Sequence, residues 1–287
     1  MSTTIQPRRS HRAANTNSGR PLSMALAIAR DSGVIAWRNL IRLRRTPGSI
    51  FTSVLQPIMF VLLLAYVFGG SLGGDAYREF LIGGILAQTL TFNASFTAIG
   101  LSNDLQLGLI DRYRALPMSR IAVILGRTTS DLATSGISIT VTMLCGLAIG
   151  WRATSGIGSF LAACGLLLLF TFAMSWIGAV IGLTARSVEV AQSLGLIWLF
   201  PVTFISGAFV SIEEMPGPLR VVAEWNPVTA VATALRDLFG NDAPAGLVQP
   251  DGWPATHPLA YAVGCSLVII GVFAAIAVTQ YRRINAR

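Results

Sequence analysis

Long apolar runs alternate with short polar segments along the chain, and their lengths predict its elements. A helix of about 20 apolar residues, rising about 1.5 Å per residue, crosses the ~30 Å hydrocarbon core of a bilayer. Backbone groups in lipid must bond to one another, and no closed-barrel alternation is visible, so each such run is predicted to be a helix. Six runs qualify: 50–68, 80–101, 121–150, 157–183, 190–210 and 259–279. The predicted fold is an all-α integral membrane protein whose six transmembrane helices form one domain, 47–287.

The composition of the 287 residues supports a membrane protein. Hydrophobic residues make up 53% of the chain and charged residues only 12%, whereas soluble domains carry about 25% charged residues.

The N-terminal segment is polar over 1–23, where it is predicted to be a disordered basic cytoplasmic tail. From 24 to 46 apolar residues and arginines follow two adjacent helical stripes, which predicts an amphipathic helix on the inner membrane surface. The alternative is a cytoplasmic extension of the first span, although Pro47-Gly48 favours a break. The residues assigned to this interfacial helix are Trp37, Arg38, Arg42 and Arg45.

The basic residues orient the predicted spans. All 21 are arginines. With both termini in the cytoplasm, nine precede the first span, four lie within 112–127, one is Arg186 and three end the chain. The four that remain outside are Arg78, Arg152, Arg220 and Arg236. This asymmetry follows the positive-inside rule, and six spans return the C-terminus to the cytoplasm. The net charge of +8 therefore reflects topology and does not indicate a nucleic-acid partner.

Residues that could carry catalysis are scarce. The two histidines lie in the tail and in an outer loop, and the cysteines lack the spacing of a metal site, so no catalytic, cofactor-binding or metal-binding residue is assigned. A P-loop needs the lysine of GxxxxGK[ST], and this chain has no lysine. If ATP drives the protein, another polypeptide binds it.

Asp131 is an acid well inside an apolar run. Intramembrane charges are functional candidates, but Arg127 precedes Asp131 by one helical turn, which favours an ion pair at i, i+4.

Three segments carry a resemblance to a known family. "DRYRALPMSR" (111–120), between the second and third spans, resembles the cytoplasmic coupling segment of type-2 ABC exporter permeases, and the daunorubicin-resistance branch is the most similar. "LFPVTFISGAFV" (199–210) resembles the fifth span of that branch, and "MPGPLRVVAEWNPVTAVATALRDL" (215–238) resembles the outer segment that follows. Many relatives carry a glutamate–glycine pair before the coupling segment. This chain lacks that pair.

The resemblance implies a homodimer or heterodimer of permease chains with two cytoplasmic ATPase subunits, which bind ATP and Mg. A short cytoplasmic helix would seat in each ATPase through apolar anchors and arginines, and a proline would end it. The acidic contact would be Asp104 or Asp111. The assigned coupling residues are Asp104, Asp111, Arg112, Tyr113, Arg114, Leu116, Pro117, Met118 and Arg120.

The outer segment 211–258 contains helical, half-apolar stretches that are too short to span. They are predicted either as half-helices dipping into the outer leaflet, with Asn226-Pro227 starting the second, or as an extracellular helix packed on the ends of the spans. The resemblance favours re-entry.

Polar and aromatic residues within the first, second and fifth runs suggest a transport path for a greasy or aromatic molecule, although helix packing would explain any one of them. They are Gln56, Gln88, Phe92, Asn93, Ser95, Phe96, Phe200, Thr203, Phe204 and Ser206.

Together these features predict a permease of the bacterial cytoplasmic membrane that exports a hydrophobic or amphipathic drug, antibiotic, lipid or glycolipid using the ATP of a partner. The alternative is a non-transporting membrane scaffold or receptor component that docks an ATPase.

Overall fold

The computed structural model describes residues 33, 37, 41, 47–69, 74–108, 120–210, 212, 215–241 and 252–284. These residues form helices and turns, with no strand among them. In chain order the elements are α2 (Pro47–Leu63), the π-helix η1 (Leu64–Phe68), α3 (Asp75–Gln106), α5 (Arg120–Ala148), α6 (Ile157–Thr184), α7 (Val188–Phe204), α8 (Gly217–Glu224), α9 (Pro227–Phe239), α10 (Trp253–Thr256) and α11 (Pro258–Ile284).

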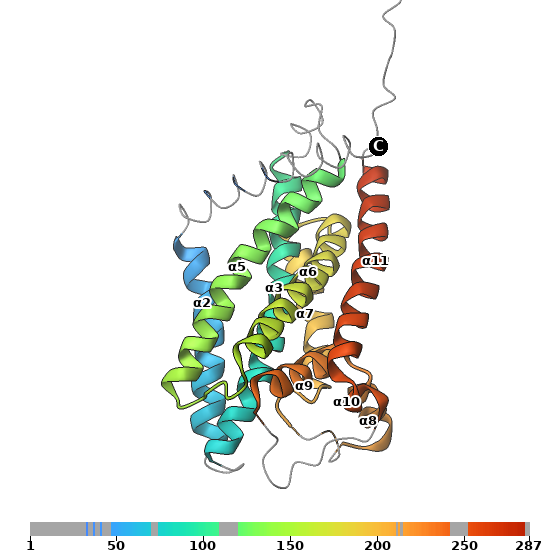
Figure 1. The fold of residues 1–287 in the computed structure, drawn as a ribbon. Coiled ribbons are helices and arrows are strands. Elements are labelled where there is room, and N and C mark those ends of the chain that lie inside the picture. The colour runs from blue at the N-terminus through green and yellow to red at the C-terminus, as the bar shows by residue number, and fades with distance from the viewer. Residues whose placement is uncertain are drawn as a thin grey trace, which may run out of the picture.

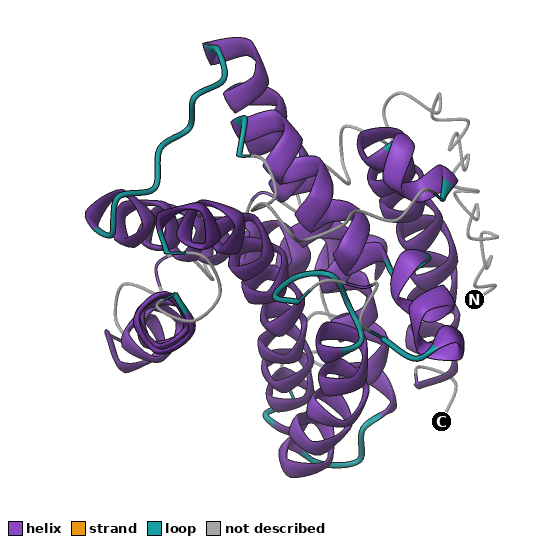
Figure 2. Cartoon of the chain, turned by 90° about the horizontal axis from the view of Figure 1, so that it is seen from below, coloured by secondary structure: helices purple, strands orange, loops and turns teal. Residues whose placement is uncertain are grey.

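Within the described residues, four helices, α3, α5, α6 and α11, are long and apolar enough to cross a membrane. Two shorter apolar stretches are Val54–Val67, which runs from α2 into η1, and Val188–Phe204, which is α7. The predicted all-helical membrane protein is therefore confirmed at this level. Helix α3 forms the centre, because α5, α6, α7 and α9 all pack against it. The short helices α8, α9 and α10 gather at the end of the bundle opposite the C-terminus (Figure 1), and Figure 2 shows the bundle from that end.

Glycines bring α6 against α3. A methyl group on Gly178 would overlap the carbonyl of Ala94, and one on Gly182 would lie 2.6 Å from the carbonyl oxygen of Ala98. This Gly-xxx-Gly pair therefore lets two helices of the same chain approach closely. The pair at 146 and 150 behaves differently, since α5 ends at Ala148 and Gly150 occupies a turn with φ +103°, a conformation that favours glycine.

Helix α7 ends earlier than predicted. The apolar run continues to Val210, but the helix stops at Phe204. Pro201 lies in its last turn and has no amide hydrogen to donate. The side-chain amide of Asn226 donates to the carbonyls of Val202 and Ile205, both at 2.6 Å. The predicted helix to Val210 is therefore wrong over its last six residues, because α9 satisfies backbone groups that a longer helix would have paired internally.

Helix α9 has well-formed caps at both ends. Asn226 accepts a hydrogen bond from the amide of Val228 at 2.9 Å, and Pro227 follows it, as predicted. Gly240 closes the other end with φ +72°. The connection after α5 binds this end: Trp151 Nε1 donates to Asn241 Oδ1 at 2.7 Å, and the amide of Thr154 donates to the carbonyl of Phe239.

Candidate functional site

The connection between α3 and α5 carries most of the predicted coupling residues. Gly108, with φ +63°, lies just beyond α3, and α5 begins at Arg120, whose side chain lies outside the described residues. The other members outside the described residues are Asp111, Arg112, Tyr113, Arg114, Leu116, Pro117 and Met118. Asp104 is described, and it belongs to a buried charge network.

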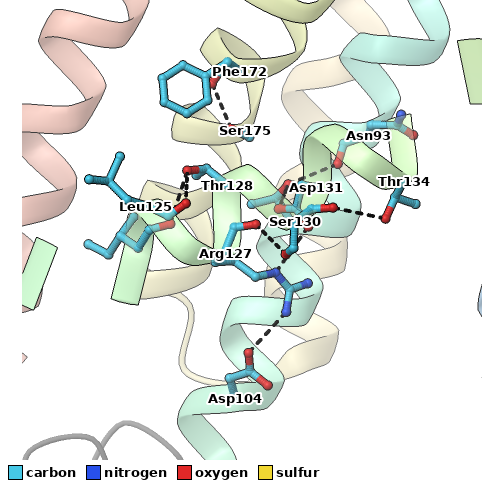
Figure 3. A network of polar contacts seen from close by, with 12 residues as sticks. Asn93, Asp104, Leu125, Arg127, Thr128, Ser130, Asp131, Thr134, Phe172 and Ser175 are labelled. Atoms are coloured by element: carbon cyan, nitrogen blue, oxygen red, sulfur yellow. Dashed lines mark hydrogen bonds and ion pairs between the residues drawn. The ribbon is translucent and has the colours of Figure 1, made fainter. Parts of the chain in front are cut away.

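Arg127 of α5 lies at the centre of that network (Figure 3). Its Nη1 atom lies 3.1 Å from Asp104 Oδ2 of α3, and its Nε atom lies 3.3 Å from Asp131 Oδ1, one turn further along α5. The second contact is a close ion pair and not an aligned hydrogen bond, because Nε makes no hydrogen bond there. The ion pair predicted between Arg127 and Asp131 is confirmed, and Asp104 is a second partner that sequence spacing did not indicate.

Two further hydrogen bonds extend the contact between α3 and α5. Thr97 donates to Asp131 Oδ2 at 2.7 Å, and the side-chain amide of Asn93 donates to Ser135 Oγ at 2.9 Å. Gly100 of α3 leaves the space for the guanidinium, because a methyl group at this position would overlap Arg127. Asn93, predicted on the transport path, therefore faces α5. We refer to the six side chains Asn93, Thr97, Asp104, Arg127, Asp131 and Ser135 as the polar ladder.

Aromatic rings from α2, α3 and α7 make a second feature. The ring centroids of Phe60 and Phe92 are 6.4 Å apart, those of Phe92 and Phe200 are 5.9 Å apart, and those of Phe200 and Phe204 are 5.8 Å apart. We call these four residues the aromatic row. Phe200 and Phe204 are exposed, as is Phe96 one turn from Phe92, so the row is open to the surroundings of this chain. Sequence analysis missed Phe60, because an aromatic residue within an apolar run does not stand out.

The remaining predicted path residues are less uniform. Gln88 and Ser95 of α3 are buried, and within the described part of the chain Gln88 Nε2 and Ser95 Oγ have no hydrogen-bond partner. Ser95 faces Gly195 of α7. Thr203 and Ser206 are also buried, and their hydroxyls donate to the backbone carbonyls of Leu199 and Thr203, both in α7. Gln56 is half-buried on α2.

Arg236 of α9 forms a buried site that sequence analysis assigned only to the outer side of the membrane. Its side chain is 3% exposed. Nε donates to the carbonyl of Phe80 at 2.9 Å, Nη1 to that of Gly207 at 3.0 Å, and Nη2 to that of Ala208 at 2.7 Å. The guanidinium carbon also lies 3.4 Å from the centre of the Phe80 ring, a cation–π geometry. Arg236 therefore joins α9 to α3 and to the turn after α7.

The predicted interfacial helix is described at three positions. Gly33, Trp37 and Ile41 are helical and exposed, and their spacing of four residues places them on one face. Arg38, Arg42 and Arg45 lie outside the described residues. In the described part of the chain no group of three or more histidine, cysteine or acidic residues could hold a metal ion.

Comparison with known proteins identifies the family. The model of the ABC-2 type transporter family matches residues 31–239. The chain belongs to the ABC-2 type transporter family. As a member of that family it is the transmembrane permease subunit of an ABC exporter, so the predicted resemblance is confirmed.

Individual relatives agree with this assignment. The chain is 30% identical over 252 residues to the daunorubicin resistance ABC transporter permease protein DrrB1 of Streptomyces coeruleorubidus, covering 87% of this chain and 85% of that protein. It is 22% identical over 227 residues to the putative transport permease ycf38 of Porphyra purpurea, covering 77% and 78% respectively. It is also 26% identical to a segment of the multidrug resistance protein CDR2 of Candida albicans, covering 85% of this chain and 16% of that protein.

Proposed function

We propose that this permease exports a hydrophobic or amphipathic molecule, a drug, antibiotic, lipid or glycolipid, from the cytoplasm or the inner leaflet of a bacterial cytoplasmic membrane. Two separate ATPase subunits hydrolyse ATP with Mg, and a second permease chain, identical or different, completes the transporter. The observation that carries this proposal is the family match over 31–239, a range that includes the connection between α3 and α5. The missing P-loop lysine supports a separate ATPase.

Six spans with both termini in the cytoplasm fit the helices best. The continuous helix 47–68 is long enough to cross the ~30 Å core. Helix α7, with 17 residues, reaches about 26 Å at 1.5 Å per residue. Helix α9 lies beyond the end of α7 and packs against α3, α6 and α11, which supports a half-helix within the outer part of the membrane domain. The arginine distribution supports cytoplasmic termini.

The substrate class rests on the aromatic row. Exposed Phe200 and Phe204, stacked with a centroid distance of 5.8 Å, offer flat apolar surfaces that suit a planar aromatic group. The name of the Streptomyces relative includes daunorubicin, which is such a molecule. We therefore propose an amphipathic aromatic compound, with Gln88 and Ser95 available as polar contacts.

Coupling to the ATPase is assigned to the connection between α3 and α5. Asp104 is 7% exposed and paired with Arg127, which favours Asp111 for the acidic contact. Tyr113, Leu116 and Met118 supply apolar anchors. Charge reversal at Arg112 and Arg114 should abolish co-purification of the ATPase, whereas reversal at Arg220 of α8 should not. Normal co-purification and normal stimulation of hydrolysis by substrate would refute this assignment.

Reconstitution tests the transport function itself. The permease and the ATPase that co-purifies with it are placed in proteoliposomes, and daunorubicin fluorescence reports its movement. We expect ATP-dependent flux that vanishes when the ATPase is inactivated. Hydrolysis without flux of daunorubicin or of labelled lipids would instead identify a scaffold that docks an ATPase.

A further inference from the structure

The contacts of the polar ladder run antiparallel along α3 and α5. Asn93 contacts Ser135, Thr97 contacts Asp131, and Asp104 contacts Arg127. The α5 members are spaced by four residues. On α3, Thr97 follows Asn93 by four residues and Asp104 follows Thr97 by seven, so each set lies along one face of its helix. A single face of α3 is therefore joined to a single face of α5 at three successive levels.

The charged residues of this contact oppose movement of α3 along α5. Sliding α3 by one turn along α5 would move Asp104 about 5.4 Å from Arg127 and break their ion pair in a place that is mostly shielded from water. Unpairing a buried ion costs far more than losing an exposed pair. The contact of α3 with α6 differs, because it uses Gly178 and Gly182 against backbone carbonyls and no charge has to be separated when those surfaces shift.

The polar ladder also joins the end of α3 to the beginning of α5, on either side of the connection between these two helices. Asp104 lies in the last turn of α3, and Arg127 lies two turns into α5. The chain between these helices is the proposed contact with the ATPase. A force on that contact reaches α3 and α5 together, and their separation at this point is fixed by the pair of Asp104 and Arg127.

We infer that Arg127 is a positioning residue for coupling: through Asp104 and Asp131 it makes α3 and α5 move as one unit when the ATPase acts on the connection between them. The inference rests on the proposed function and adds a residue outside the predicted contact surface. Without Arg127 the same force separates the two helices at their cytoplasmic ends, so that ATP is hydrolysed without moving substrate.

The first test measures coupling in proteoliposomes that contain the permease and its ATPase. In Arg127→Gln, daunorubicin flux per ATP hydrolysed should fall about tenfold, within the range of typical coupling free energies between sites, while the amount of assembled complex and the hydrolysis rate stay within about twofold. Arg127→Lys keeps the positive charge but lacks the guanidinium fork that contacts both Asp104 and Asp131. Its flux per ATP should lie between those of the wild type and Arg127→Gln. Arg220→Gln removes an ion pair of α8 with Glu224 and should leave the ratio unchanged.

Asp104→Asn is a milder variant. It removes the carboxylate charge of Asp104, and Arg127 keeps Asp131 as its ion-pair partner. It should also lower flux per ATP. A normal ratio in both Asp104→Asn and Arg127→Gln would overturn the inference while leaving the proposed transport function intact. Absent flux in the wild type would instead contradict the proposed function.

The second test follows the helices directly and needs no substrate. Spin labels are placed at Gln106 of α3 and Thr129 of α5, both exposed, after replacement of Cys145, Cys164 and Cys265. In the wild-type complex the distance distribution should stay the same when a non-hydrolysable ATP analogue binds. In Arg127→Gln it should match the wild type without nucleotide and lengthen or broaden with the analogue. Broadening already present without nucleotide would show that Arg127 only stabilises the resting fold, and no broadening in either state would show that it does not hold the two helices together. Either result would overturn the inference.

Discussion

At the scale of single residues, the two buried arginines illustrate what spacing along the chain can predict. The pair of Arg127 and Asp131 lies at i, i+4, so helical periodicity alone indicated it. The role of Arg236 had no such signal, since its three acceptors are backbone carbonyls of residues 80, 207 and 208, and any residue type supplies a carbonyl. Only the fold brings those positions to one guanidinium.

Replacing Arg236 by glutamine should destabilise the permease strongly. Three charge-assisted hydrogen bonds are lost, and a glutamine amide cannot replace all three donors, so the loss of unfolding free energy should be about 3 kcal/mol or more. Thermal unfolding of the purified protein in detergent measures this change. The control is Arg220→Gln, whose i, i+4 pair with Glu224 is partly exposed and should cost at most about 0.5 kcal/mol. Equal melting temperatures for the two variants would contradict this role of Arg236.

At the scale of elements, the apolar pattern predicted where helices lie better than where they end. Helix α6 occupies 157–184, within one residue of the predicted span. The end of α7 at Phe204 was not predicted, because residues 205–210 continue the apolar run without a charged residue. Their backbone groups bond to side chains of α9 and its cap instead. Asn226 donates to the carbonyl of Ile205, Arg236 donates to the carbonyl of Gly207, and the hydroxyl of Thr229 accepts from the amide of Gly207. Hydropathy does not report such long-range partners.

Asn226 has two separable roles, and substitutions can distinguish them. Its carbonyl oxygen caps α9, and its amide donates to the last carbonyls of α7. Asn226→Ala loses both roles and should cost about 3 kcal/mol, from one cap and two hydrogen bonds. Asn226→Asp keeps the cap but places acceptors against carbonyls, so it should destabilise at least as much in thermal unfolding. If Asn226→Asp melts like the wild type, the contact with α7 contributes nothing to stability.

Glycines of α6 provide a matched pair for testing the packing against α3. A methyl group on Gly178 overlaps Ala94, whereas one on Gly165 meets nothing within 4 Å. Gly178→Ala should lower the unfolding free energy by about 1–3 kcal/mol through overpacking, and Gly165→Ala should be neutral or slightly stabilising because alanine favours helix. Thermal unfolding of both variants in one detergent gives the comparison. Similar melting temperatures would show that α3 and α6 can separate at Gly178 without cost.

At the scale of the whole molecule, run lengths predicted an all-helical membrane protein and the order of its helices. They could not predict that α3 lies at the centre, because all the long helices are apolar on most faces and hydropathy does not rank them. Helix α3 is instead distinguished by small and polar residues, such as Gly84, Gly100 and Asn93, which admit neighbouring backbones and side chains. In the part of the chain that the structure describes, four helices meet the length and hydropathy expected of a span, so the crossing of α2 and α7 stays a prediction.

Labelling from one side of the membrane tests the crossing of α7. Arg186, before α7, and Gly217, after it, are both exposed. Each is replaced in turn by a single cysteine in a protein whose three native cysteines have been replaced. If α7 spans, a membrane-impermeant maleimide should label Gly217→Cys in intact cells and should label Arg186→Cys only after permeabilisation. His257→Cys, before α11, should behave like Gly217→Cys, and Gln106→Cys, at the end of α3, like Arg186→Cys. Labelling of both positions around α7 from the same side would reduce the number of spans and place one terminus outside the cytoplasm.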